Sequence, residues 1–314
     1  MVSVCVLSYN HERYLRQCLD GIFMQEVSFP IEVRVHDDAS TDRSQEIIKE
    51  YQERYPDILK PLLQSENQYS KGGGILNKFL LPLCEGKYIA LCEGDDYWTD
   101  PLKLQKQVDF LEKHEDYGFV GSNVFVESNG KRQAEPSKLF GVSEGDFELV
   151  GDVFESAKYG PVTRTVSLVY RRDLVRPYNK YSGGDLLLQS ILAKLSKYAY
   201  YRGYSCVYRA GVGISNSFLQ EERALKYNEI IIKQRKTQKM LFPKDCNWPE
   251  DELEDHGDYL RLIYAIRKVK WKKALICKKT LRSVTYRNKS YSKYLFGPIS
   301  CFFLSIVLKM KHHE

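Results

Sequence analysis

Strands and helices alternate through the first 63 residues, and this alternation restricts the fold more than any other feature of the sequence. Val2–Ser8 is a β-rich apolar run, and Ile31–Asp37 alternates apolar and polar residues, so both are predicted strands. Helices are predicted after each of them, over Tyr14–Phe23 and Ser44–Tyr55. This order is typical of a parallel sheet with helices on its faces.

Later segments extend the same pattern with less regular spacing. Residues 127–147 are polar and are predicted to be an irregular surface insertion, and the α/β pattern ends near residue 217. We therefore expect an α/β domain over residues 1–217 and a helical, basic segment over residues 218–314. The further predicted strands are Leu59–Gln64, Tyr88–Cys92, Phe119–Val126, Thr165–Tyr170, Tyr198–Tyr201 and Tyr204–Arg209, and the further helices are Leu102–His114, Leu186–Leu195 and Phe218–Leu241.

Two short-range motifs predict how the first helices begin. Asn10 is a residue type that favours helix N-caps, and we expect it to cap the helix that follows. Asp42, with Gln45 three residues later, resembles a capping box for the helix at Ser44.

The composition indicates a protein of the reducing cytoplasm. The eight cysteines are scattered singly without a Cys-x-x-Cys pair, which argues against a disulfide framework and a zinc site. Met1 leads straight into the first strand, so no secretory signal is expected.

The C-terminal end carries most of the positive charge. Residues 259–313 hold fourteen Lys or Arg and no acid, although the whole chain is only +6. Leu295–Leu308 is almost entirely apolar, but its fourteen residues are fewer than a membrane-spanning helix needs. With basic residues on both sides it can lie in an anionic membrane interface, and the alternative is a buried terminal helix. We expect cytoplasmic localisation, with peripheral association at the inner face of the membrane as the hypothesis.

Acidic residues follow two of the predicted strands. Asp37 and Asp38 end the second strand, and Glu93, Asp95 and Asp96 follow the strand that begins at Tyr88. Ligands of open α/β sheets bind outside the carboxyl ends of the strands, so these acids are candidate site residues. A hard divalent cation bound by one or two carboxylates and a substrate's phosphates would relieve their repulsion. The alternative is a solvated turn that caps the next helix.

A glycine-rich loop precedes the acidic strand. Asn67–Gly74 ends in three glycines and could fold over a ligand, but it lacks the Gly-Lys-Ser/Thr ending of a P-loop. An ordinary turn is the equal alternative. Asn77 and Lys78 follow it, and Lys78 is a candidate donor-binding residue.

Four stretches resemble inverting glycosyltransferases of family two, the bacterial surface-polysaccharide type with a GT-A (Rossmann-like) fold. They are Val4–Asn10, Val35–Asp42, Glu93–Trp98, and Gly184–Asp185 with Tyr208–Arg209 downstream, so the resemblance covers residues 1–215. It implies a mostly parallel sheet flanked by helices, followed here by a C-terminal helical extension. It also implies a nucleotide-sugar donor and Mg or Mn.

The resemblance also implies roles for single residues. It places Leu7, Ser8, Tyr9, Asn10 and Asp38 at the nucleotide, with Asp37 beside them, and Asp95 at the ribose or sugar of the donor. Asp96 would hold the metal with Glu93 as its second candidate ligand, and Asp185 would match the catalytic base. An N-cap for the following helix is the alternative role for Asp185.

The sequence departs from the family pattern at two points. Glu93 stands where the family's first Asp is usual, which leaves its role open. Many relatives carry a histidine soon after this Tyr-Arg pair, but Ala210–Ile214 follow Tyr208-Arg209 here, so no histidine ligand is assigned.

The favoured interpretation is a metal-dependent transferase that moves a sugar from a nucleotide-sugar, with UDP as the expected nucleotide, to a hydroxyl of a glycan or lipid-linked glycan. The mechanism is one displacement: Asp185 takes the acceptor's proton and the metal at Asp96 stabilises the leaving diphosphate. A nucleotidyltransferase is the enzymatic alternative, and it would want an early phosphate loop that the chain lacks. The non-enzymatic alternative is a nucleic-acid-binding protein that uses the basic tail. The favoured interpretation involves no nucleic acid.

Overall fold

The computed structural model describes residues 1–72, 74–181, 184–212 and 220–246. The chain divides into two compact units, of which the first comprises Met1–Phe218 and Lys233–Asn247. Of the second unit, the structure describes only residues 220–232, in the first part of one helix. The predicted domain boundary at residue 217 and the predicted segments after residue 246 lie outside the described residues.

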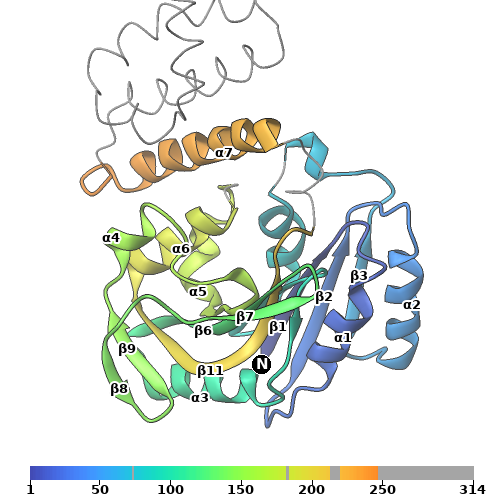
Figure 1. Cartoon of the computed structure of the whole chain (residues 1–314), viewed down its shortest axis with the longest axis horizontal. Coiled ribbons are helices and arrows are strands. Elements are labelled where there is room, and N and C mark those ends of the chain that lie inside the picture. Colours follow the sequence, from blue (N-terminus) through green and yellow to red (C-terminus); the bar gives the residue numbers. More distant parts are fainter. Residues whose placement is uncertain (73, 182–183, 213–219, 247–314) are drawn as a thin grey trace, which may run out of the picture. The chain divides into compact units, whose positions relative to one another are not determined.

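A mixed sheet forms the centre of the first unit (Figure 1). Its order is β3-β2-β1-β4-β10-β6-β11-β9-β8, with β5 paired to β11 and β7 paired to β6. The strands are β1 (Val2–Ser8), β2 (Ile31–Asp37), β3 (Leu59–Leu63), β4 (Tyr88–Glu93), β5 (Tyr97–Trp98), β6 (Tyr117–Ser128), β7 (Lys131–Glu135), β8 (Val142–Glu144), β9 (Phe147–Gly151), β10 (Val169–Arg171) and β11 (Lys197–Arg209).

Helices and single helical turns connect these strands. The α-helices are α1 (Leu15–Phe23), α2 (Ser44–Arg54), α3 (Lys103–Lys113), α4 (Phe154–Ala157), α5 (Arg172–Val175), α6 (Gly184–Leu195) and α7 (Gln220–Leu241). The short turns are η1 (Tyr69–Lys71), the π-helical η2 (Leu76–Leu80), η3 (Leu81–Leu83), η4 (Thr165–Ser167) and η5 (Arg176–Tyr178). None of the described helices is long and apolar enough to cross a membrane.

The predicted α/β architecture is confirmed. β1, β2, β3 and β4 pair in parallel, and so do β6 and β11. The antiparallel pairings all involve the short strands β5, β7, β8, β9 and β10. The apolar faces of α1, α2 and α3 join one continuous core with the strands, and Figure 1 shows α5 and α6 on the other side of the sheet from α3.

Three local predictions were wrong. Residues 127–147 are not an irregular insertion, because they form β7 and β8 and lead into β9. Residues 198–209 form one long strand instead of two, with irregular register near Tyr204. The predicted strand at Thr165 begins as the turn η4.

The six cysteines in the described part of the chain are buried and free.

The predicted helix caps were also wrong. α1 begins after Tyr14 without a side-chain cap, because Asn10 has a φ of 55° and bonds to the loop after β2 instead. The capping box at α2 does not form, since the Gln45 side chain donates to the Asp37 carboxylate at 2.9 Å.

Candidate active site

The carboxyl ends of β1, β2 and β4 meet at one edge of the sheet. Ser8 pairs with Asp37 across β1 and β2, and Leu7 pairs with Glu93 across β1 and β4. Residues that follow these strands are therefore neighbours, as the sequence predicted from the parallel order.

Asp37 and Asp38 hold loops at this edge. Asp37 is fully buried and accepts hydrogen bonds from the Ser40 backbone N–H and the Gln45 amide, both at 2.9 Å. Asp38 accepts from the backbone N–H groups of Gln68 and Tyr69 at 2.7 and 3.0 Å. Both oxygens of Asp38 thus fix the start of the glycine-rich loop, a role that the sequence did not predict. A contact with a nucleotide stays a prediction for both residues.

The last residues of β1 and the first residues after it differ in how much of their polar surface is free. The Ser8 hydroxyl is buried and has no hydrogen-bond partner, while Leu7 and Tyr9 are half-buried. Asn10 is tied to the loop after β2: its N–H donates to Ser40 Oγ, and its Oδ1 accepts from the Thr41 N–H, both at 2.8 Å. The Asn10 side chain therefore serves first to join two loops.

The acidic turn after β4 is tight and internally bonded. The Asp96 N–H donates to the Glu93 carbonyl at 2.9 Å, and the Gly94 N–H donates to the Leu7 carbonyl at 2.8 Å. Asp96 is only 1% exposed; its Oδ1 accepts from the Arg209 backbone N–H at 2.7 Å, and its Oδ2 has no partner. Burial, and then the charge of Asp95, raise the pKa of Asp96 to about 8.

Asp185 belongs to the same cluster of charges. Burial raises the pKa of Glu93 well above its usual range, and the charges of Asp185, Asp96 and Asp95 add to this effect. Burial is also the main cause of the raised pKa of Tyr208, where Asp96, Glu93 and Asp95 act in the same direction. The charges of Asp95, Asp96 and Asp185 thus all act on Glu93, although Asp185 lies about 90 residues further along the chain.

Lys78 lies beside the glycine-rich loop. It is exposed in η2, and its Nζ lies 3.9 Å from the point where a side chain on Gly72 would begin. Within the described residues no carboxylate forms an ion pair with it, so its ammonium group can meet an anionic ligand.

The acidic cluster fits a divalent cation that arrives with a substrate. Among the described residues, no group of three or more His, Cys, Asp or Glu is arranged to hold a metal by itself. The buried, unpartnered Oδ2 of Asp96 is the observation that favours a cation, because such an oxygen is costly to bury without a partner. Mg or Mn commonly binds through one or two carboxylates plus substrate phosphates, so Asp96 and Glu93 suffice as protein ligands.

Two site residues were missed by the sequence interpretation. His11 follows the β1 motif directly, and its Nε2 lies 4.0 Å from Asp95 Oδ2, while its Nδ1 is buried without a partner. Burial lowers the pKa of His11 against the opposing charges of Asp95, Asp42 and Asp37. Arg209 was matched as part of a motif but given no role; its side chain donates to the Asp95 carbonyl and its backbone N–H to the Asp96 carboxylate.

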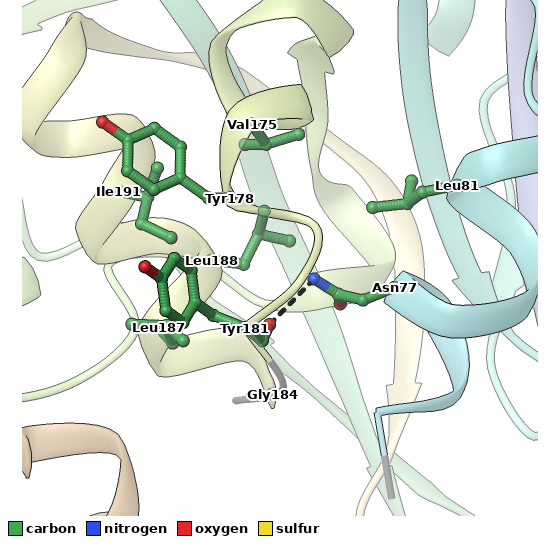
Figure 2. Close-up of a pocket in the computed structure, with 9 residues that line it drawn as sticks. All are labelled: Asn77, Leu81, Val175, Tyr178, Tyr181, Gly184, Leu187, Leu188 and Ile191. Atoms are coloured by element: carbon green, nitrogen blue, oxygen red, sulfur yellow. Dashed lines mark hydrogen bonds between the residues drawn. The ribbon is translucent and has the colours of Figure 1, made fainter. Parts of the chain in front are cut away.

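A small pocket adjoins the start of α6 (Figure 2). Figure 2 shows the Asn77 side chain pointing toward Tyr181, and the Asn77 amide donates to the Tyr181 carbonyl at 3.1 Å. The pocket offers only about 10 Å³ to the centre of a water molecule, so it has room for about one water. It separates η2, which carries Lys78, from the segment that carries Asp185.

The family model for "Glycosyl transferase family 2" matches residues 3–172. Among curated proteins, an uncharacterized protein of Mycobacterium tuberculosis is 50% identical over 113 residues, which is 36% of this chain and 32% of that protein. The Escherichia coli UDP-Glc:alpha-D-GlcNAc-diphosphoundecaprenol beta-1,3-glucosyltransferase WfaP is 27% identical over 129 residues, 41% of this chain and 48% of that protein. The match thus spans from about a third to about half of the length of these relatives.

Solved structures share the fold at low sequence identity. The Staphylococcus aureus TarS 1-349 complex with UDP-GlcNAc has a TM-score of 0.56 at 20% identity, over 82% of this chain and 71% of that one. The mannosyltransferase PcManGT from Pyrobaculum calidifontis, in complex with GDP-Man and Mn2+, has a TM-score of 0.52 at 15% identity, over 100% of this chain and 81% of that one. Both comparisons show a common GT-A fold.

Proposed function

Since this chain belongs to glycosyl transferase family 2 and is a glycosyltransferase, we propose that it transfers a sugar from a UDP-sugar to a hydroxyl of a glycan or lipid-linked glycan. We propose inversion at the anomeric carbon and dependence on Mg or Mn. The observation that carries this proposal is Oδ2 of Asp96, which is buried next to Asp95 without a hydrogen-bond partner. The charges of Asp96 and Asp185 also both act on Glu93.

In the proposed mechanism the chain's carboxylates have separate tasks. Asp96, with Glu93, holds the metal, which when bound stabilises negative charge on the leaving diphosphate. Asp95 accepts hydrogen bonds from hydroxyls of the donor, and Leu7, Ser8, Tyr9, Asn10, Asp37, Asp38 and Lys78 form the rest of the donor-binding edge. Asp185 takes the proton of the acceptor hydroxyl as its oxygen attacks. Asp185 is exposed at the start of α6, which suits a base that must meet an incoming acceptor.

The comparisons support the donor and acceptor classes by analogy. The names of WfaP and of the TarS complex contain UDP-sugars, and the WfaP name describes a diphosphoundecaprenol acceptor. The PcManGT complex contains Mn2+. The family match favours sugar transfer over the nucleotidyltransferase and nucleic-acid-binding alternatives. We also propose a cytoplasmic enzyme held at an anionic membrane surface by the basic segment 218–314.

The donor is tested by thermal unfolding of the wild-type chain with Mn²⁺ and UDP-, GDP- or dTDP-sugars. We expect stabilisation by UDP-sugars, together with slow metal-dependent hydrolysis of the donor when no acceptor is present. Stabilisation by GDP-sugars alone would replace the UDP assignment, and no binding of any nucleotide-sugar would contradict the proposal.

The base is tested by Asp185→Asn, which keeps the size of the side chain and removes its ability to accept a proton. We expect at least a hundredfold loss of transfer with a nearly unchanged Kd for the donor. Asp173→Asn is the matched control, because Asp173 is also an exposed acid in the first turn of a helix, α5. Equal loss of donor affinity in Asp185→Asn would assign the residue a structural role.

A further inference from the structure

Arg209 joins four elements around the acidic turn. It ends β11 and is only 6% exposed, and its guanidinium lies over two rings, 4.8 Å from the centre of Tyr14 and 4.4 Å from that of Tyr97. It donates to the Asp95 carbonyl at 2.6 Å and to Glu127 at 3.3 Å, and it also bonds to Gln17 of α1. All parts of this side chain are therefore held.

The same residue reaches both acids of the turn. Its side chain fixes the peptide after Asp95, while its backbone N–H occupies Oδ1 of Asp96 at 2.7 Å. Together these contacts determine how the Asp96 carboxylate is rotated, and they leave Oδ2 as the oxygen without a protein partner. A planar guanidinium with several donors can hold a carbonyl, a carboxylate and an amide at once, and a lysine ammonium cannot reproduce that geometry.

We propose that Arg209 is a positioning residue that orients the Asp95–Asp96 turn so that Oδ2 of Asp96 is presented to a divalent cation. The inference rests on the proposed function for its ligand, a divalent cation with a nucleoside diphosphate. In this assignment Arg209 contacts neither the cation nor the nucleoside diphosphate, and it acts through Asp95 and Asp96.

Arg171 provides a matched control for a purely structural arginine. It also bonds to backbone carbonyls, those of Tyr117 at 2.9 Å, His114 at 3.2 Å and Leu111, and it stacks on a ring, 5.6 Å from the centre of Tyr88. Arg171 pairs with Tyr88, the first residue of β4, whereas the acidic turn follows the last. At about 3.3 Å per residue the two sites are roughly 16 Å apart along the strand.

The test compares the Mn²⁺ affinity, in the presence of UDP, of wild type, Arg209→Met, Arg209→Lys and Arg171→Met. Binding is measured in electron paramagnetic resonance as the loss of the signal of free Mn²⁺. Thermal unfolding and amide hydrogen exchange of residues 93–97 are measured on the same samples without metal. We expect at least tenfold weaker Mn²⁺ binding and faster exchange in Arg209→Met, and partial recovery in Arg209→Lys. Arg171→Met should lose thermal stability but keep its Mn²⁺ affinity within twofold and its exchange in the acidic turn.

Several results would overturn the inference. One is an Arg209→Met variant whose Mn²⁺ affinity and amide hydrogen exchange in the turn equal those of wild type. Another is an Arg171→Met variant whose Mn²⁺ affinity falls as much as that of Arg209→Met. If Arg209→Met does not fold, Arg209→Lys decides the question by the same two measurements. If wild type binds no Mn²⁺ with UDP, GDP or dTDP, the metal in the proposed function is wrong, and unchanged exchange in the variants would separately remove the role of Arg209.

Discussion

At the scale of single residues, Gly94 shows how closely the site is packed. A Cβ atom at this position would lie 2.7 Å from His11 Nδ1 and 3.1 Å from the Leu7 carbonyl oxygen. The position has no room for a Cβ atom, because the His11 ring and the end of β1 pack directly against the acidic turn. His11 and the turn are thus fitted to each other, and a change in one must displace the other.

We therefore expect Gly94→Ala to lower the free energy of unfolding by about 1–3 kcal/mol, the usual cost of overpacking. His11→Ala should reduce this cost, since it removes the ring that the new methyl group meets. The measurement is a double-mutant cycle by urea unfolding. Gly160→Ala is the control and should be nearly neutral, because no atom lies within 4 Å of the added Cβ. Additive effects of the two substitutions at positions 11 and 94 would contradict this packing account.

Single-residue roles were predictable where they depend on neighbours in the sequence. The acids of the turn could be found because they follow a recognisable buried strand, and parallel order places them beside the end of β1. The contacts of Arg209 with Asp96 and Gln17 could not be found, since their partners are 113 and 192 residues away. The same separation hides the placement of His11 against Gly94.

At the scale of elements, η2 and the segment before α6 are joined by one hydrogen bond across the pocket of Figure 2, from Asn77 to the Tyr181 carbonyl. π-helical turns such as η2 occur often at functional sites. η2 carries Lys78 on the predicted donor side, and α6 carries Asp185 on the predicted acceptor side. The bond therefore links the two halves of the proposed reaction.

We expect Asn77→Ala and Asn77→Asp to lower kcat for transfer several-fold while KM for the donor changes little, because neither variant can donate to Tyr181 and the base loses its support. The cost in stability should be about 1 kcal/mol. Steady-state kinetics and thermal unfolding measure the two effects. Gln105→Ala is the control and should leave kcat unchanged: it removes the side-chain hydrogen bonds that Gln105 of α3 makes with Asp109 and with the Ser28 N–H, neither of which involves a residue of the pocket. A higher donor KM with unchanged kcat would show that Asn77 acts on the donor alone.

Elements were predicted well where the hydrophobic pattern is strong. β1 begins and ends where the β-rich apolar run predicted, and β2 where the alternation of apolar and polar residues predicted. β7 and β8 were missed because their residues are mostly exposed and polar, and pairing with β6 and β9 makes them strands. The predicted capping box failed because the Gln45 side chain found a stronger partner in the buried Asp37 carboxylate.

At the scale of the whole molecule, the core contains a lysine that forms no ion pair with a carboxylate of the described residues. Lys103 is fully buried; its Nζ donates to the Gln107 side chain at 2.7 Å and lies 4.4 Å from the centre of a Trp98 ring. Burial lowers the pKa of Lys103 to about 8, from the usual 10.5. The unfolded chain therefore binds more protons than the folded chain between these two pH values, and stability must rise with pH across that window.

We expect the free energy of unfolding of wild type to rise by about 2 kcal/mol relative to Lys103→Met between pH 7 and pH 10. Urea unfolding of both proteins at several pH values measures this difference and removes the contribution of other titrating groups. Lys49→Met is the control, because Lys49 is exposed on α2 and should show no such dependence. A constant difference between wild type and Lys103→Met across this range would mean that Lys103 titrates normally.

Strand β11 lies inside the sheet, between β6 and β9, yet it is the last of the described strands to be synthesised. Until it leaves the ribosome, one edge of β6 and its apolar residues lack their parallel neighbour. An open apolar edge invites pairing with other nascent chains, so truncated products that end before residue 197 carry an aggregation hazard which the finished protein does not. A chain that ended at residue 172, where the family match ends, would be such a product, and it would lack both Asp185 and Arg209.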